Sequence, residues 1–234
     1  MILGAELVGD EELRVVPVVV ILVISFVLSV IVIAVAAIML ILQGVVDFSD
    51  LFQAIIALAV PIFDVSLLVV TLVYVVKKEL FKFMGLTLNG KFIAAGLLWG
   101  LALFTINLVI SYSMSQVLGE EFTGRIYEYL ISYRLTRYVL IVTAILLAPI
   151  AEELYFRGLL YASLKIKIGV LGGAIVSAAI FAAAHGIPAA FIALLAIGAT
   201  LAYIFEKYKS LVPAIMAHAV NNTLGIAILL ILKH

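Results

Sequence analysis

Long apolar runs separated by short polar breaks dominate the chain. The runs are Val15–Leu42, Leu51–Val76, Phe92–Leu118, Tyr138–Leu164, Val170–His185, Ala189–Phe205 and Leu211–Leu232. Most of them reach the roughly 20 residues with which a helix crosses about 30 Å of hydrocarbon. Because the bilayer core offers no water to backbone groups, helices are the expected spanning elements. The pattern predicts an all-α, polytopic transmembrane bundle of about seven helices, forming one integral-membrane domain over residues 1–234. The tight, uncharged HGIP break predicts that the fifth and sixth runs form a hairpin.

Composition supports this interpretation and excludes several classes of function. Of the 234 residues, 67% are hydrophobic and only 12% are charged, whereas about 25% of residues are charged in a typical soluble domain. The net charge is zero and the chain has no basic run, so we expect no nucleic-acid partner. The absence of cysteine excludes disulfides, thiol catalysis and zinc sites built from cysteine.

The distribution of basic residues predicts how the bundle is oriented. Lysines gather in the loops after the second, fourth and sixth runs: Lys77, Lys78, Lys82, Lys91, Lys165, Lys167, Lys207 and Lys209. We therefore expect a multi-pass protein of the cell membrane, with the N-terminus and these loops in the cytoplasm. The arginine-bearing stretch Gly119–Thr136 has aromatic and aliphatic residues at helical spacing, and it is predicted to lie as an amphipathic segment on the opposite membrane surface.

The sequence EELYFR brings charged residues into the fourth run. Charges at bilayer depth are costly and usually face a polar interior, where they mark function or fix helix packing. Glu153 and Arg157 are four residues apart, so they share a helix face and are predicted to pair. Glu152 is rotated by about 100° from Glu153 and is left free to act as a general base. Pro149, which has no N–H, frees a carbonyl near Glu152.

Two histidines also fall within apolar runs. His185 continues a stripe of small and aromatic residues at four-residue spacing, so it is expected to face the bundle interior. His218 and Asn222 share one face of the last run, and the adjacent Asn221 is expected to point away. Hydrogen bonding that only fixes helix packing is the plain alternative for these residues. Asp64 is predicted to face a cavity or a helix break, and a proton-relay role is the alternative for it.

Three motifs together resemble those of a known family. EELYFR (Glu152, Glu153, Arg157), FAAAH (Phe181, His185) and HAVNN (His218, Asn222) are similar to the EExxxR, FxxxH and HxxxN motifs of the CAAX-protease and bacteriocin-processing family. This family comprises intramembrane endopeptidases related to the Rce1-type prenyl-protein protease. The resemblance defines a catalytic core at 138–232. Because the best-known members are eight-helix bundles, it raises the expected number of helices to seven or eight.

The resemblance implies hydrolysis of a peptide bond within the membrane. Glu152 would activate the attacking water and His185 would help to hold it. His218 and Asn222 would stabilise the oxyanion, while Glu153, Arg157 and Phe181 would support the site. The substrate would be a membrane-associated protein or peptide, and the family's best-known branch cuts prenylated C-terminal CaaX sequences.

The metal requirement has two possible answers at this stage. We favour a mechanism without a metal or other cofactor, because the two histidines come from different helices and asparagine is a poor zinc ligand. The alternative is a zinc site with Glu152, His185 and His218 as ligands.

Two other functions remain open. The first is a proton-coupled transporter or channel that uses Glu152, His185 and Asp64, although such proteins commonly show inverted repeats. The second is a catalytically idle protein that binds peptides or confers immunity.

Overall fold

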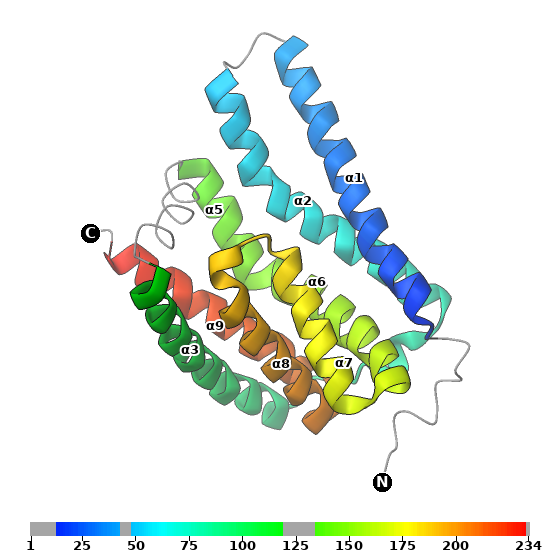
Figure 1. The fold of residues 1–234 in the computed structure, drawn as a ribbon. Coiled ribbons are helices and arrows are strands. Elements are labelled where there is room, and N and C mark those ends of the chain that lie inside the picture. Colours follow the sequence, from blue (N-terminus) through cyan, green and yellow to red (C-terminus); the bar gives the residue numbers. More distant parts are fainter. Residues whose placement is uncertain (1–12, 43–47, 119–133, 233–234) are drawn as a thin grey trace.

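The computed structural model describes residues 13–42, 48–118 and 134–232 of the chain, and the helices there form one bundle (Figure 1). The first half contains α1 (Val15–Leu42), α2 (Phe48–Lys77), the short 3₁₀ segment η1 (Leu80–Phe83) and α3 (Gly90–Leu118). The second half begins with α5 (Arg134–Val142), the π-helical segment η2 (Thr143–Leu147), α6 (Ala148–Glu152) and the π-helical segment η3 (Glu153–Tyr161). It ends with α7 (Ala162–Ala184), the 3₁₀ segment η4 (Pro188–Ala190), α8 (Phe191–Tyr208) and α9 (Leu211–Leu232). The prediction of an all-α transmembrane bundle is confirmed for the described ranges.

The predicted number of spans is close to the observed number. Within the described ranges, six helices are long and apolar enough to cross a membrane. The difference from seven arises because the fourth and fifth predicted runs lie in one 48-residue segment, Arg137–Ala184, which counts once among the six although Gly169 divides it into two helices. Gly169 interrupts this stretch with φ 77° and ψ 173°, a backbone conformation that favours glycine. A Cβ on Gly173 would lie 2.8 Å from the Lys165 backbone nitrogen, so the chain folds back on itself at this break.

The distribution of apolar and polar side chains suits a lipid environment. Large hydrophobic residues with at least a third of their surface exposed occur along every long helix, from Val16 in α1 to Ile231 in α9. Polar side chains are instead buried between the helices, among them Ser25, Asp64 and Thr71. Lipid solvates the apolar exterior, and the interior holds the groups that lipid cannot solvate.

Two glycines let α3 approach α9 closely. Gly96 and Gly100 are four residues apart, and a Cβ on either would come within 2.5 Å of a side-chain Cβ of α9, that of Met216 or Val220. Small residues at this spacing allow two membrane helices to pack backbone against backbone. The contact holds α9, the last helix, against the bundle (Figure 1).

The predicted hairpin between the fifth and sixth runs is present. After His185 the chain turns through Gly186 and η4 into α8, which packs along α7. Gly198 of α8 faces α7 so closely that a Cβ there would lie 2.9 Å from the Cβ of Ala178. The close approach holds α7 and α8 together as a hairpin.

The lysine-bearing segments bear on the predicted orientation, and their placement in the cytoplasm stays a prediction. The lysine-bearing ends of α2, α7 and α8, together with η1, meet at one end of the bundle, near the start of α1 (Figure 1). Most of the predicted amphipathic stretch Gly119–Thr136 lies outside the described residues, which resume at Arg134.

Candidate active site

The motif EELYFR lies where the fourth predicted run changes its helical register. Glu152 ends α6, and Glu153 begins the π-helical segment η3, all of whose residues are buried. A second π-helical segment, η2, lies just before α6. π turns inside α-helices are uncommon and are frequent at functional sites. Because of these turns, the rotation from one residue to the next departs here from the uniform 100° of an α-helix.

The Asn222 side chain supplies a hydrogen bond that the backbone of Pro149 cannot donate. In η2 the Ala148 N–H bonds to the Thr143 carbonyl, five residues back. In the same register the next donor, for the Ala144 carbonyl, would be Pro149, which has no N–H. Asn222 Nδ2 donates to that carbonyl from α9 at 2.9 Å. The proline thus creates an acceptor, and Asn222 satisfies it across two helices.

Glu153 is the centre of a buried ion-pair network. Arg157 Nη1 donates to Glu153 Oε1 at 2.7 Å, which confirms the predicted pair. His218 Nδ1 bonds to the same oxygen at 2.9 Å. Arg157 Nη2 donates to the Gly198 carbonyl of α8 at 3.1 Å. The network therefore joins η3 to α8 and to α9, and it includes His218, which sequence spacing alone did not connect to Glu153.

Glu152 lies between the two predicted histidines. Its side chain has an exposed fraction of only 11%, and Oε2 has no hydrogen-bond partner. His185 Nε2 lies 4.0 Å from Oε1, and His218 Nε2 lies 3.8 Å from Oε2. Glu152 from α6, His185 from the end of α7 and His218 from α9 therefore converge.

Hydrogen bonds at Nδ1 orient both histidine rings. His185 Nδ1 lies 2.8 Å from the Phe181 carbonyl, which can only accept, so this nitrogen carries the proton. His218 Nδ1 is held by the Glu153 carboxylate. In both rings Nε2 is left to face Glu152. A neutral ring with Nδ1–H has a lone pair at Nε2, so the three side chains present acceptors to one another.

Phe181 packs against the charged and polar groups of the site. Its side chain is fully buried, and its ring centroid lies 4.6 Å from that of His185 and 6.0 Å from that of His218. The Arg157 guanidinium lies 4.6 Å from the same ring centroid. Phe181 thus packs against the guanidinium and both histidine rings, and its supporting role stays a prediction.

Asp64 is a further acidic residue at this centre and comes from the first half of the chain. It is 1% exposed, its Oδ2 has no hydrogen-bond partner, and its charge interacts with that of Glu152. The helix that carries it, α2, packs against α6. Its position after Pro61 indicated a cavity, but only the packing of α2 on α6 brings it to Glu152.

Asn221 corrects one expectation from sequence. It was expected to point away from the site, but it is 5% exposed and its Nδ2 donates to Asn222 Oδ1 at 3.1 Å. α9 is packed on more than one side. Asn221, which is rotated by about 100° from Asn222 around the helix, therefore lies on another buried face and does not face lipid. Asn221 therefore supports Asn222.

The site contains side chains of the kinds that bind zinc. Two histidine nitrogens with fixed Nδ1 partners and one carboxylate are a chemical set that zinc accepts. However, within the described residues no group of three or more His, Cys, Asp or Glu side chains is placed to hold a metal ion. A site without a metal stays a prediction from the sequence.

Comparison with known proteins gives one match. Residues 134–224 match the family model described as type II CAAX prenyl endopeptidase Rce1-like. No curated protein and no solved structure shows a significant match to the chain. The matched segment begins with α5 and ends within α9, so it includes all the motif residues, but it covers less than half of the chain and excludes Asp64.

Proposed function

We propose that this chain, which belongs to the Rce1-like family of type II CAAX prenyl endopeptidases through residues 134–224, is an intramembrane endopeptidase with Glu152 as its general base. The convergence of Glu152, His185 and His218 on one point is the observation that carries the proposal. Because all three present acceptor atoms there, a water molecule bound among them would direct its hydrogens toward the carboxylate and an imidazole. The oxygen lone pairs of that water would remain available for attack.

In the proposed reaction, Glu152 takes a proton from this water as the water oxygen bonds to the carbonyl carbon of the scissile peptide. The electron pair of the carbonyl π bond moves to the oxygen, which becomes an oxyanion. Glu152 then gives its proton to the peptide nitrogen as the C–N bond breaks. The products are a new carboxyl group and a new amine, and the carboxylate of Glu152 is regenerated.

The other polar groups have separate roles in this proposal. His185, fixed by the Phe181 carbonyl, accepts the second hydrogen of the water at Nε2. His218 donates to the oxyanion through Nε2 once the ring has taken up a second proton there and become an imidazolium, while its Nδ1–H stays bonded to Glu153. Asn222 uses one amide hydrogen on Ala144, and its second amide hydrogen is the one that serves the oxyanion. Each donor of this kind contributes about 3–4 kcal/mol to transition-state stabilisation.

We infer that no metal takes part. This reading is supported by the two histidines, which come from the end of α7 and from α9 and not from one helix, and by Asn222, since asparagine is a poor zinc ligand. The proposed substrate is a peptide or protein that reaches the site from the membrane, and a prenylated CaaX peptide is the first to test.

The test is a cleavage assay in detergent on matched peptides that do or do not carry a prenylated CaaX terminus. We expect the wild-type protein to hydrolyse at least one peptide, with or without exhaustive chelation. Glu152→Gln should remain folded and bind that peptide without cleaving it. Full activity of Glu152→Gln would refute the general-base assignment, and stoichiometric zinc that is lost in His185→Ala would refute the metal-free mechanism.

A proton-coupled transporter is kept as a second candidate because Asp64 lies beside Glu152. Two buried acidic groups on different helices are typical of proton pathways through membranes. Proteoliposomes with an imposed pH gradient and an internal pH dye would detect such a pathway. Proton flux that is lost in both Asp64→Asn and Glu152→Gln, without cleavage of any peptide, would favour transport over hydrolysis.

A further inference from the structure

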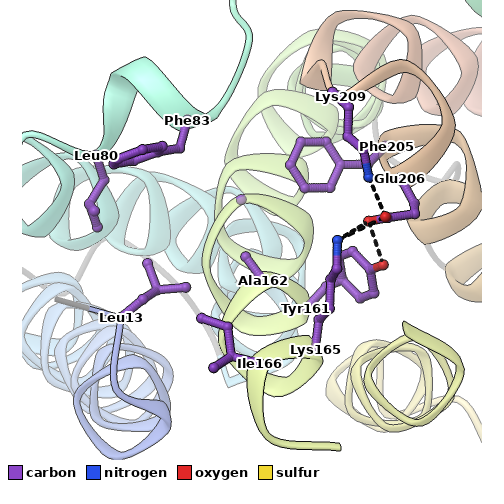
Figure 2. A pocket seen from close by; sticks show the side chains of 11 residues that line it. Leu13, Leu80, Phe83, Tyr161, Ala162, Lys165, Ile166, Phe205, Glu206 and Lys209 are labelled. Atoms are coloured by element: carbon purple, nitrogen blue, oxygen red, sulfur yellow. Dashed lines mark hydrogen bonds and ion pairs between the residues drawn. The ribbon is translucent and has the colours of Figure 1, made fainter. Parts of the chain in front are cut away.

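A pocket of about 100 Å³ lies at the lysine-bearing end of the bundle, apart from Glu152 and the histidines. It is lined by Leu13 just before α1, by residues of η1, η3, α7 and the end of α8, and by Lys209 just after α8. Figure 2 shows Lys165, Glu206 and Lys209 together on one side, with Phe205 beside them, and Leu13, Leu80 and Phe83 on the other. The charged side consists of Tyr161, Lys165, Glu206 and Lys209.

The charged side has hydrogen-bond donors and positive charge in excess. Glu206 accepts hydrogen bonds from Lys165 at 2.7 and 2.8 Å, from Tyr161 at 2.8 Å, and from Lys209. Each ammonium group has three N–H donors. Lys165 uses two of these on Glu206 and Lys209 uses one, so three N–H groups and one net positive charge are left over.

A further ammonium group lies next to the pocket. Lys82 Nζ is 5.0 Å from the centroid of the Phe83 ring, and Phe83 lines the pocket. Tyr161, whose only donor is used on Glu206, adds no negative charge. The site is therefore complementary to a small anion with several acceptor oxygens, such as a phosphate.

The opposite side of the pocket is apolar and favours an amphipathic occupant over a free ion. Leu13, Leu80 and Ile166 form it together with Phe83. A free phosphate gains nothing from these side chains. In a phospholipid, by contrast, the glycerol and the first part of the acyl chains lie directly beside the phosphate. Lysine pockets between membrane helices at the headgroup level are known to bind anionic lipids.

We propose that this pocket binds the phosphate of an anionic phospholipid. Lys165 and Lys209 donate to the phosphate oxygens, and the glycerol–acyl region packs on Leu80, Phe83 and Ile166. Glu206 keeps the two ammonium groups together and at the same time weakens the binding, because its own carboxylate competes for them. The site involves none of the motif residues, so it does not depend on the proposed hydrolysis.

The test is native mass spectrometry of the full chain released from detergent, with phosphatidylglycerol, phosphatidylcholine or inorganic phosphate added. We expect phosphatidylglycerol to bind more tightly than phosphatidylcholine. Lys209→Ala should weaken phosphatidylglycerol binding about fivefold, the effect of one lysine near a membrane surface. Lys209 is 56% exposed, so its loss should not unfold the protein.

Lys207→Ala is the matched control. It removes the same charge two residues away, but Lys207 packs on Trp99, Tyr203 and Tyr208 and does not line the pocket. Its phosphatidylglycerol affinity should equal that of the wild type, whereas Glu206→Gln should bind more tightly. Equal losses in Lys207→Ala and Lys209→Ala would show a general surface attraction and overturn the proposal. Competition by inorganic phosphate at the same concentration as the lipid would also overturn it.

Discussion

At the scale of single residues, neighbours in the sequence have different environments. Glu153 bonds to both Arg157 and His218, whereas Glu152 Oε2 has no hydrogen-bond partner and lies 3.8 Å from His218 Nε2. Oε2 of Glu153 has no partner either, but Oε1 of Glu153 is held by the buried Arg157 guanidinium, and such a pair stabilises the fold. The Glu152 carboxylate faces two histidine nitrogens instead, and this placement suits proton transfer. Substitutions of the two residues should therefore have different effects.

Glu153→Gln should destabilise the protein strongly. Glutamine can still accept hydrogen bonds, but it removes the opposite charge that is hydrogen-bonded to the buried Arg157 guanidinium. Breaking a buried pair in this way costs about 3–5 kcal/mol. The midpoint of thermal unfolding in detergent measures the effect. Glu206→Gln, which breaks a partly exposed pair with Lys165, is the control and should cost about 1 kcal/mol or less. Equal losses in the two variants would contradict the structural role of Glu153.

Asn222→Ala should lower kcat by about 10²–10³ with little change in KM, which is the usual effect of removing one oxyanion donor. It should also reduce stability, because the Ala144 carbonyl loses its partner. Asn222→Asp should be worse, since a carboxylate would face both that carbonyl and the oxyanion. Thr223→Ala is the control, because Thr223 is exposed and bonds only within α9. A normal kcat in Asn222→Ala would leave this residue with a structural role alone.

At the scale of elements, glycines decide how closely helices approach and where they turn. Gly96 and Gly100 let α3 pack on α9, and Gly198 lets α8 pack on α7. Gly169 has a backbone conformation that lets the chain reverse between η3 and the rest of α7. Since α9 carries His218 and Asn222, the α3 contact fixes the position of two site residues from outside the matched segment.

Gly100→Ala should therefore destabilise the protein and lower its activity. The added methyl group would lie 2.5 Å from the Val220 Cβ, so α9 has to move. Overpacking of this kind costs about 1–3 kcal/mol. Gly225→Ala is the matched control, because it adds the same methyl group to α9 where no atom lies within 4 Å. Thermal unfolding and peptide cleavage should be measured together for both variants, and equal behaviour would show that the close approach does not matter.

At the scale of the whole molecule, both halves of the chain contribute to one charged centre. Asp64, Glu152 and Glu153 bring three carboxyl groups to the interior, and Arg157 is the guanidinium beside the two glutamates. Asp64 comes from α2, which lies outside the residues that match the family. An interior with more acidic than basic groups is costly, and such sites are retained mainly where function requires them.

Asp64→Leu should raise thermal stability. The change removes an unpartnered buried oxygen and its repulsion with Glu152, and it replaces them with an apolar side chain of similar size. A gain of about 1–3 kcal/mol is expected from removing an unsatisfied buried group. Asp64→Asn, which removes the charge but keeps a polar group, should gain less. A lower melting temperature for Asp64→Leu would show that Asp64 has a stabilising partner.

The sequence by itself determined two kinds of feature: the membrane-spanning helices, which the lipid environment imposes, and the contacts between residues of the same helix. Apolar runs long enough for a bilayer become helices because lipid leaves the backbone no other partner. The Glu153–Arg157 pair follows from a spacing of four residues, and the turn at HGIP follows from glycine and proline. The three motifs also contain Glu152, His185 and His218, which lie close together in the structure.

Only the tertiary structure decided which atoms meet. The bonds from His218 to Glu153 and from Asn222 to Ala144 depend on how α9 is rotated and shifted against η2 and η3. The position of Asp64 likewise depends on the packing of α2 on α6. Rotation and axial shift are set by side-chain packing over the whole length of two helices. The spacing of residues within one helix carries no information about them.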